Sequence, residues 1–223
     1  MLIKNDVDIK ICTPYYNNIC EETRDSIYGL LDSDRLNCAW LYHRGTAIAT
    51  NRNFLINEGK SDLEFQKIDD SFSHYLFIDS DIVVTVNDVE KLLEYDFDII
   101  SASYIDRDNN DCYVGGHFLK DINNIINGVN KLSIFHRGIL EVDWVGGGCL
   151  LVKKKVFETL PFPWFRHTIL NKYKNGNKHC LMVHEDVGFS LLAKQYGYKI
   201  YLDCNIKVDH LSSKEFRELN EFF

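Results

Sequence analysis

Apolar and polar positions in the first half of the chain fall into short strand-like runs separated by stretches of helical periodicity. The strand-like runs are 7–13, 38–43, 74–79 and 98–104, and the helical stretches are 46–59 and 86–95. Gly59 is expected to end the first helix, and Asn87 or Asp88 to lie near the start of the second. Strands and helices that alternate in this order predict an open, mainly parallel α/β sheet.

The second half of the chain has a different pattern. Short strand-like pieces and glycine-containing turns fill residues 111–152, and the lysine run 153–155 indicates the solvated start of a helix. A later helix is predicted over 186–196, ended by Gly197, and two strands are predicted after it, 199–203 and 205–210. No internal repeat or low-complexity linker divides the chain, so we predict a single domain over 1–223.

Composition and charge exclude several classes of protein. The chain has 223 residues, of which 45% are hydrophobic, enough for a packed core. Its net charge of −8 argues against a general nucleic-acid surface, and neither a membrane-spanning apolar run nor a signal peptide is recognisable. The seven cysteines include no CxxC pair, which favours reduced, buried thiols over disulfides or a zinc site. We therefore expect a cytoplasmic protein without a nucleic-acid partner.

The stretch YLFIDSDIVV, residues 75–84, places Asp79 and Asp81 at the end of a strand that otherwise has a buried composition. Unpaired charges are costly to bury, so the two carboxylates need solvent, a base or a cation beside them. The same spacing recurs at Asp6/Asp8, Asp32/Asp34, Asp96/Asp98 and Asp106/Asp108. Only Asp79 and Asp81 have apolar runs on both sides, so only they are expected at the edge of a core strand.

These two carboxylates can approach one divalent cation, because residues two apart on an extended chain project to the same side. Oxygen ligands of this kind suit Mg²⁺ or Mn²⁺, which commonly bind one or two carboxylates together with substrate phosphates. In an open α/β sheet, ligands bind beyond the carboxyl ends of the strands, so Thr13, Pro14 and Tyr15 are expected at the same edge. A capped Asx-type turn at the acids and a packed turn at Pro14 are the alternatives.

Two further motifs have unusual residues for their positions. Gly146, Gly147 and Gly148 interrupt a strand-like run, which indicates either close approach of the backbone to a ligand or a simple bend. Glu185 and Asp186 precede a helix, where one acid can act as a cap. The second, Asp186, is then a candidate general base for an acceptor hydroxyl.

Taken in order, these features resemble those of the GT-A-fold glycosyltransferases that use a nucleotide-sugar donor. The resemblance covers nearly the whole chain and rests on CTPYYNN, ATNRNFLI, YLFIDSD, DIISASY, VGGGCLLVKKKVFE, HEDVGFSLLAKQYGYKIYLD and VDHL. It implies a Rossmann-like open mixed sheet of the nucleotide-diphospho-sugar transferase type. Residues 1–110 would form the nucleotide-binding half, and residues 111–223 would bind the acceptor and complete the metal site.

The resemblance also implies a role for each matching residue. The metal ligands would be Asp79, Asp81 and His210, and His179 and His184 are the rival histidines. The nucleotide-binding residues would be Thr13, Pro14, Tyr15, Arg52, Asp79 and Ser80. The residues along the donor sugar and acceptor would be Trp144, Gly146, Gly147 and Gly148. The general base would be Asp186 or Glu185 if the enzyme inverts the anomeric centre.

The expected activity is metal-dependent transfer of a sugar, from a nucleotide-diphosphate sugar and most simply a UDP-sugar, to a hydroxyl of a glycan or glycoprotein. Mn²⁺ or Mg²⁺ would neutralise the charge that develops on the departing diphosphate. Two other functions stay open. Asp79 in FIDSDIVV also resembles the nucleophile of haloacid-dehalogenase-type phosphohydrolases, and the fold could serve as a non-catalytic carbohydrate-binding module.

Overall fold

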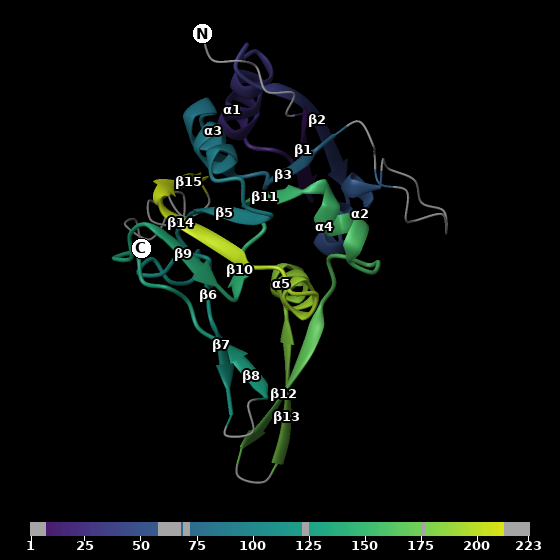
Figure 1. Ribbon diagram of the computed structural model, residues 1–223, viewed down its shortest axis with the longest axis vertical. Helices are drawn as coiled ribbons and strands as arrows, with labels where there is room; N and C mark the ends of the chain where they lie inside the picture. Colours follow the sequence, from purple (N-terminus) through teal and green to yellow (C-terminus); the bar gives the residue numbers. More distant parts are fainter. Residues whose placement is uncertain (1–7, 58–67, 69–71, 122–124, 175–176, 212–223) are drawn as a thin grey trace.

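The chain folds around a central sheet with helices on both faces (Figure 1). The computed structural model describes residues 8–57, 68, 72–121, 125–174 and 177–211. In these ranges the helices are α1 (Glu21–Leu31), α2 (Ile48–Ile56), α3 (Val86–Glu94), α4 (Lys154–Thr159) and α5 (Glu185–Gln195). The strands are β1 (Asp8–Tyr15), β2 (Asn37–Arg44), β3 (His74–Ile78), β4 (Ile82–Val83), β5 (Ile99–Ser103), β6 (Gly115–Gly116), β7 (Phe118–Lys120), β8 (Ile126–Val129), β9 (Ile139–Val142), β10 (Trp144–Val145), β11 (Cys149–Lys153), β12 (Thr168–Lys174), β13 (Asn177–Val183), β14 (Ile200–Lys207) and β15 (Asp209–His210).

Seven of these strands form the central sheet, in the order β2-β1-β3-β11-β5-β14-β9. Strand β1 is parallel to β2 and β3, and β14 is parallel to β5. Strand β11 is antiparallel to both β3 and β5, and β9 is antiparallel to β14. The mixed α/β sheet with flanking helices confirms the predicted fold class. Strands β1, β2, β3, β5 and β14 run in the same direction, as expected for a mainly parallel sheet, whereas β9 and β11 run opposite to them. Strand β11 comes from the second half of the chain and inserts between two strands of the first half.

The two faces of the sheet are covered by different helices (Figure 1). Helices α1 and α3 contribute Ile27 and Val89 to the core on one face. Helices α2, α4 and α5 contribute Leu55, Phe157 and Phe189 to the core on the other face. Strands β3, β5 and β11 are almost wholly buried between these layers, which explains their nearly continuous apolar sequences.

Most of the predicted elements are present. The runs at 7–13, 38–43, 74–79 and 98–104 correspond to β1, β2, β3 and β5, and the two predicted helices of the first half correspond to α2 and α3. Asp88 lies in the first turn of α3, where its side chain and that of the N-cap Thr85 form a capping box. Gly59 lies outside the described residues. Helix α1 was not predicted, because its apolar pattern is weak. Its buried residues are Thr23, Ile27 and Leu30, and many of the residues between them are polar.

The C-terminal pattern was predicted as two strands, 199–203 and 205–210, and this division was wrong. Strand β14 continues through Asp203 to Lys207, with a register shift between Asp203 and Lys207 where it pairs with β5. The Asp203 carboxylate accepts hydrogen bonds from the N–H groups of Asn205 (2.7 Å) and Ile206 (3.4 Å), which holds this irregular segment. Gly197, with a φ of 85°, follows α5 as predicted.

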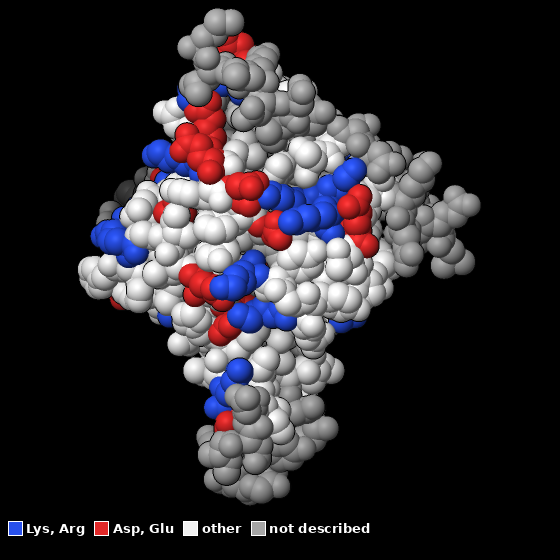
Figure 2. Space-filling view, in the orientation of Figure 1, with Lys and Arg blue, Asp and Glu red and all other residues white. Residues whose placement is uncertain are grey.

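Outside the central sheet, two hairpins extend from the same end of the molecule (Figure 1). They are the antiparallel pairs β7–β8 and β12–β13. No helix in the described part of the chain is long and apolar enough to cross a membrane. Figure 2 shows acidic and basic side chains intermixed on the visible face, without a continuous basic surface. All seven cysteines are free thiols; Cys12, Cys149 and Cys204 are buried, whereas Cys180 is exposed.

Candidate functional site

The acid pair lies in the short connection between β3 and β4. Asp79 follows the last residue of β3, and its N–H group donates a 3.0 Å hydrogen bond to the carbonyl oxygen of Gly148. The carbonyl oxygen of Asp79 accepts a 3.1 Å hydrogen bond from Ile82, so the chain turns sharply at this point. Asp81 is therefore held at the carboxyl end of a buried strand, as the sequence predicted.

His210 is brought to Asp81 by the pairing of two very short strands. In the antiparallel pair of β15 with β4, His210 is opposite Ile82, and the N–H group of Leu211 donates a 2.9 Å hydrogen bond to the carbonyl oxygen of Asp81. The Nε2 atom of His210 lies 3.5 Å from an Oδ2 oxygen of Asp81. Both residues are largely buried. A carboxylate and an imidazole side by side have the donor atoms that a divalent cation needs.

The orientation of the His210 ring is fixed by the backbone of the neighbouring strand end. Its Nδ1 atom lies 2.8 Å from the carbonyl oxygen of Ile105, which can only accept, so Nδ1 carries a hydrogen and Nε2 faces Asp81. Burial lowers the pKa of His210, but hydrogen bonds to Asp81 and Ile105 outweigh it, and the pKa is raised on balance. The Asp81 carboxylate thus favours a positive charge beside it.

Arg107 supplies such a charge in this structure. Its Nε–H group donates a 3.1 Å hydrogen bond to Nε2 of His210, and its Nη2 atom forms an ion pair with the Asp81 carboxylate. The Arg107 side chain is 56% exposed. Sequence reasoning missed this residue. The usable signal was its position, shortly after β5, because residues beyond the carboxyl ends of neighbouring strands share one edge of the sheet.

Arg52 connects Asp79 to the acids at the start of α5. It is only 2% exposed, and its guanidinium contacts Asp79 (Nη2 to Oδ1, 2.7 Å) and Glu185 (Nε to Oε1, 3.4 Å). It also donates a 2.9 Å hydrogen bond to the carbonyl oxygen of Gly147. Burial lowers the pKa of Arg52, but the carboxylates of Asp79 and Glu185 raise it by a larger amount, so the guanidinium stays charged. Burial raises the pKa of Asp79 despite the opposing effect of Arg52.

Asp186 is the second residue of α5 and lies directly after Glu185. Its Oδ1 atom accepts a 2.7 Å hydrogen bond from the N–H group of Val187. Burial, followed by the negative charge of Glu185, raises the pKa of Asp186 to about 6. A carboxylate whose pKa approaches neutrality is better suited to take a proton than an ordinary aspartate.

The three successive glycines make room for side chains of the site. A Cβ atom at Gly147 would lie 2.5 Å from the Cζ atom of Arg52. At Gly146 it would lie 2.1 Å from the hydroxyl oxygen of Tyr104, and at Gly148 2.8 Å from the same side chain. That hydroxyl also accepts a 2.9 Å hydrogen bond from the N–H group of Gly148. The close approach that the sequence predicted is therefore made to Arg52 and Tyr104, two side chains of the protein itself.

The residues predicted around the nucleotide differ in accessibility. Thr13 is fully buried, and its hydroxyl accepts a 3.0 Å hydrogen bond from the indole N–H group of Trp40. Pro14 is buried, whereas Tyr15 and Ser80 are partly exposed.

Trp144, which the resemblance places along the donor sugar and acceptor, is 3% exposed. It packs in an apolar cluster with Leu170, Val187 and Leu191, and its indole N–H group donates to the carbonyl oxygen of Asn130. These contacts favour a packing role for this residue.

Of the rival histidines, His184 does not contact Asp81 but lies beside Glu185. The ligand atoms of His167, His184 and Glu185 all lie within 4.8 Å of one another. The side chain of His179 is outside the described part of the structure. His167 received no role from the sequence, because its approach to His184 depends on the pairing of β12 with β13.

The arrangement of strands and helices is that of GT-A-fold proteins. The chain is similar to A197 from STIV, with a TM-score of 0.53 and 18% identity over 88% of this chain and 81% of that one. It is also similar to GalNAc-T7, a GT-A glycosyltransferase solved with UDP, GalNAc and Mn²⁺, with a TM-score of 0.53 and 11% identity. That match covers 92% of this chain and 44% of GalNAc-T7, so this chain corresponds to less than half of that protein. A scan of protein-family models and a search of curated proteins find no match to the sequence.

Proposed function

We propose that this protein is a metal-dependent glycosyltransferase that moves a sugar from a nucleotide-diphosphate sugar, with a UDP-sugar as the first choice, to a hydroxyl group of a glycan or glycoprotein. The observation that carries the proposal is the convergence of Asp81 and His210 at the carboxyl end of β3. The acids Asp79, Glu185 and Asp186 lie around Arg52 in the same region. The GT-A-like fold supports the same class, and the solved GalNAc-T7 contains UDP and Mn²⁺.

The donor atoms of Asp81 and His210 fit a divalent cation. One carboxylate and one imidazole, with the ring held through Nδ1 by a backbone carbonyl, form a common arrangement of ligand and supporting residue. Mn²⁺ is the preferred occupant, because it accepts both oxygen and imidazole ligands. When bound, the cation would neutralise negative charge on the diphosphate leaving group.

Arg107 has to release Asp81 and His210 before a cation binds them. Its exposed side chain can turn away without disturbing the core, and it would then lie close to the phosphates of the donor. Arg107 would thus hold the site in its ligand-free form and afterwards contribute a positive charge to donor binding. In this proposal Arg52 has a different task, since its buried guanidinium positions Asp79 and Glu185.

On the acceptor side, Asp186 would remove the proton of the attacking hydroxyl, with Glu185 as the alternative base. If the acceptor oxygen then attacks the anomeric carbon from the face opposite the diphosphate, the bond to the diphosphate breaks and the configuration at that carbon inverts. Tyr15 offers a partly exposed ring on which a nucleotide base can stack, at the end of the strand next to β3. The first half of the chain, 1–110, would bind the nucleotide, and 111–223 would bind the acceptor and complete the metal shell through His210.

The test is metal-dependent binding of nucleotide sugars, measured by thermal shift and then by calorimetry, with and without Mn²⁺. UDP-sugars are expected to stabilise the protein only in the presence of the cation, and Asp81→Asn is expected to abolish this metal-dependent affinity. Unchanged affinity in Asp81→Asn would contradict the metal assignment. Trapping of phosphate on Asp79 would instead favour the phosphohydrolase alternative.

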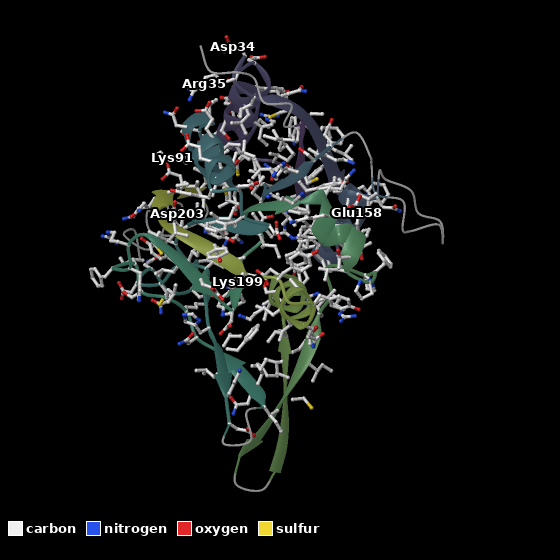
Figure 3. The ribbon with its side chains drawn as sticks, viewed as in Figure 1. Asp34, Arg35, Lys91, Glu158, Lys199 and Asp203 are labelled. Atoms are coloured by element: carbon white, nitrogen blue, oxygen red, sulfur yellow. The ribbon has the colours of Figure 1, made fainter. Side chains whose placement is uncertain are left out.

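Asp34→Asn is the matched control for this experiment. Asp34 belongs to another pair of aspartates with the same spacing, and it lies exposed between α1 and β2 at the end of the molecule opposite the hairpins (Figure 3). Donor affinity is expected to be the same in Asp34→Asn and in the original protein.

A further inference from the structure

A second group of metal-ligating side chains lies at the base of the β12–β13 hairpin. Thr168 and Val183 are the last described pair of this hairpin toward the sheet, so His167 and His184 lie at the next position on each strand. Side chains that are opposite each other on antiparallel strands approach closely, and the two imidazole rings have centroids 6.1 Å apart. The chain then enters α5 directly, which adds Glu185 as a neighbour.

The three side chains have the chemistry of a cation site. Their ligand atoms all lie within 4.8 Å of one another, and Glu185 is buried whereas both histidines are exposed. Zinc–ligand bonds of about 2.0–2.2 Å would place tetrahedral ligand atoms roughly 3.3–3.6 Å apart, so small rotations of the two exposed rings close the group. Two imidazoles and one carboxylate leave a fourth position for water, and this ligand set favours Zn²⁺ over Mg²⁺ or Ca²⁺.

The charges around Glu185 also favour a divalent cation. The carboxylates of Asp79, Glu185 and Asp186 all interact with the single guanidinium of Arg52. Three carboxylates therefore share one guanidinium, and a divalent cation beside Glu185 would reduce the negative charge that remains. Arg52 contacts the Oε1 atom of Glu185 at 3.4 Å, and a carboxylate has enough lone pairs to bind a cation as well.

We propose that His167, His184 and Glu185 bind one Zn²⁺ ion, separate from the cation at Asp81 and His210. Such an ion would join the start of β12, the end of β13 and the first turn of α5. It would thereby fix the hairpin relative to the helix that carries Asp186. The proposal does not depend on glycosyltransferase activity.

The test counts bound zinc per chain after equilibrium dialysis against Zn²⁺ alone. All variants are made in an Asp81→Asn background, which removes the other proposed cation site. The Asp81→Asn protein is expected to bind one zinc ion, and adding His167→Ala is expected to remove it. The same loss is expected with His184→Ala and with Glu185→Gln. X-ray absorption of the zinc-bound Asp81→Asn protein is expected to show two imidazole ligands.

His136→Ala is the matched control, because His136 is also an exposed histidine and lies outside the group. It is expected to leave the bound zinc unchanged. His167 precedes β12 and belongs to no helix, so His167→Ala should fold normally, which circular dichroism in the presence of a chelator checks. The proposal is wrong if the Asp81→Asn protein binds no zinc, or if His167→Ala retains it with unchanged affinity. A difference in zinc content between the original protein and Asp81→Asn tests the other site separately.

Discussion

At the scale of single residues, the site depends on a buried guanidinium. Arg52 is almost inaccessible to solvent, yet it stays charged because Asp79 and Glu185 lie against it. Removal of one partner from a buried ion pair typically costs about 3–5 kcal/mol, since the other charge is left without compensation. The acids of the site and the N-terminus of α5 are thus held in place by one side chain from α2.

Gly147→Ala is expected to destabilise the protein by about 1–3 kcal/mol, because the added methyl group would overlap the Arg52 guanidinium. The measurement is urea denaturation. Gly29→Ala is the matched control, since Gly29 lies in α1 with no atom within 4 Å of an added Cβ. It is expected to stabilise the protein by roughly 0.5–1 kcal/mol through its helix propensity. If the two substitutions change the free energy of unfolding equally, the Arg52 guanidinium does not require a glycine at position 147.

Asp186→Asn is expected to retain metal-dependent binding of the donor and to stop transfer to the acceptor. The amide is similar in size to the carboxylate, but it cannot take a proton. Calorimetry measures the donor affinity, and release of the nucleoside diphosphate in the presence of acceptor measures transfer. A variant with full transfer activity would remove Asp186 as the base.

At the scale of elements, the two short strands β4 and β15 bring the candidate cation ligands together. The pairing of β4 with β15 brings His210 to Asp81, although the two residues are far apart in the sequence. This pairing follows the irregular segment of β14, where the chain changes register relative to β5. The position of His210 therefore depends on how β14 is held at Asp203, which is labelled in Figure 3.

Asp203→Ala is expected to lower the free energy of unfolding by about 1–3 kcal/mol, because the N–H groups of Asn205 and Ile206 lose their acceptor. Asp203→Asn keeps an oxygen at this position and is expected to retain most of the stability. Urea denaturation of both variants gives the comparison. If the two substitutions have the same effect, hydrogen bonds from the backbone are not what holds this segment.

At the scale of the whole molecule, the central sheet joins the two halves of the chain. Strand β11, from the second half, lies between β3 and β5, so the connection that contains the three glycines runs directly beside the acid pair. The sheet also carries ionisable groups whose burial links global stability to pH. One of them is His74 at the start of β3, whose pKa is lowered by burial and by the positive charge of Lys153.

The lowered pKa of His74 predicts a loss of stability in mild acid. The unfolded chain takes up the proton more readily, with an ordinary histidine pKa of about 6.5. The contribution of His74 is therefore fully present above about pH 6.5 and is lost as the pH falls below that value. His74→Gln is expected to weaken this pH dependence between about pH 7 and pH 5. Urea denaturation across this range, with His136→Ala as control, tests it, and an unchanged slope in His74→Gln would contradict it.

The sequence by itself predicted the features that depend on local pattern. Apolar runs identified β1, β2, β3 and β5, and the apolar flanks of Asp79 and Asp81 distinguished them from other aspartates with the same spacing. For β1, β3 and β5 these predictions succeeded because burial of a strand is visible in its composition, whereas β2 is only partly buried. The strand direction of β11, the continuity of β14 through Asp203 and the presence of α1 were missed.

Tertiary structure decided which distant residues meet. Arg107 at Asp81 and Arg52 between Asp79 and Glu185 depend on contacts between separate elements of the chain. His167 beside His184 depends on the pairing of β12 with β13. A linear sequence records the residue types and their spacing. The direction in which strands pair, and therefore the side chains that share one edge of the sheet, is set by burial of the whole core, to which every element contributes.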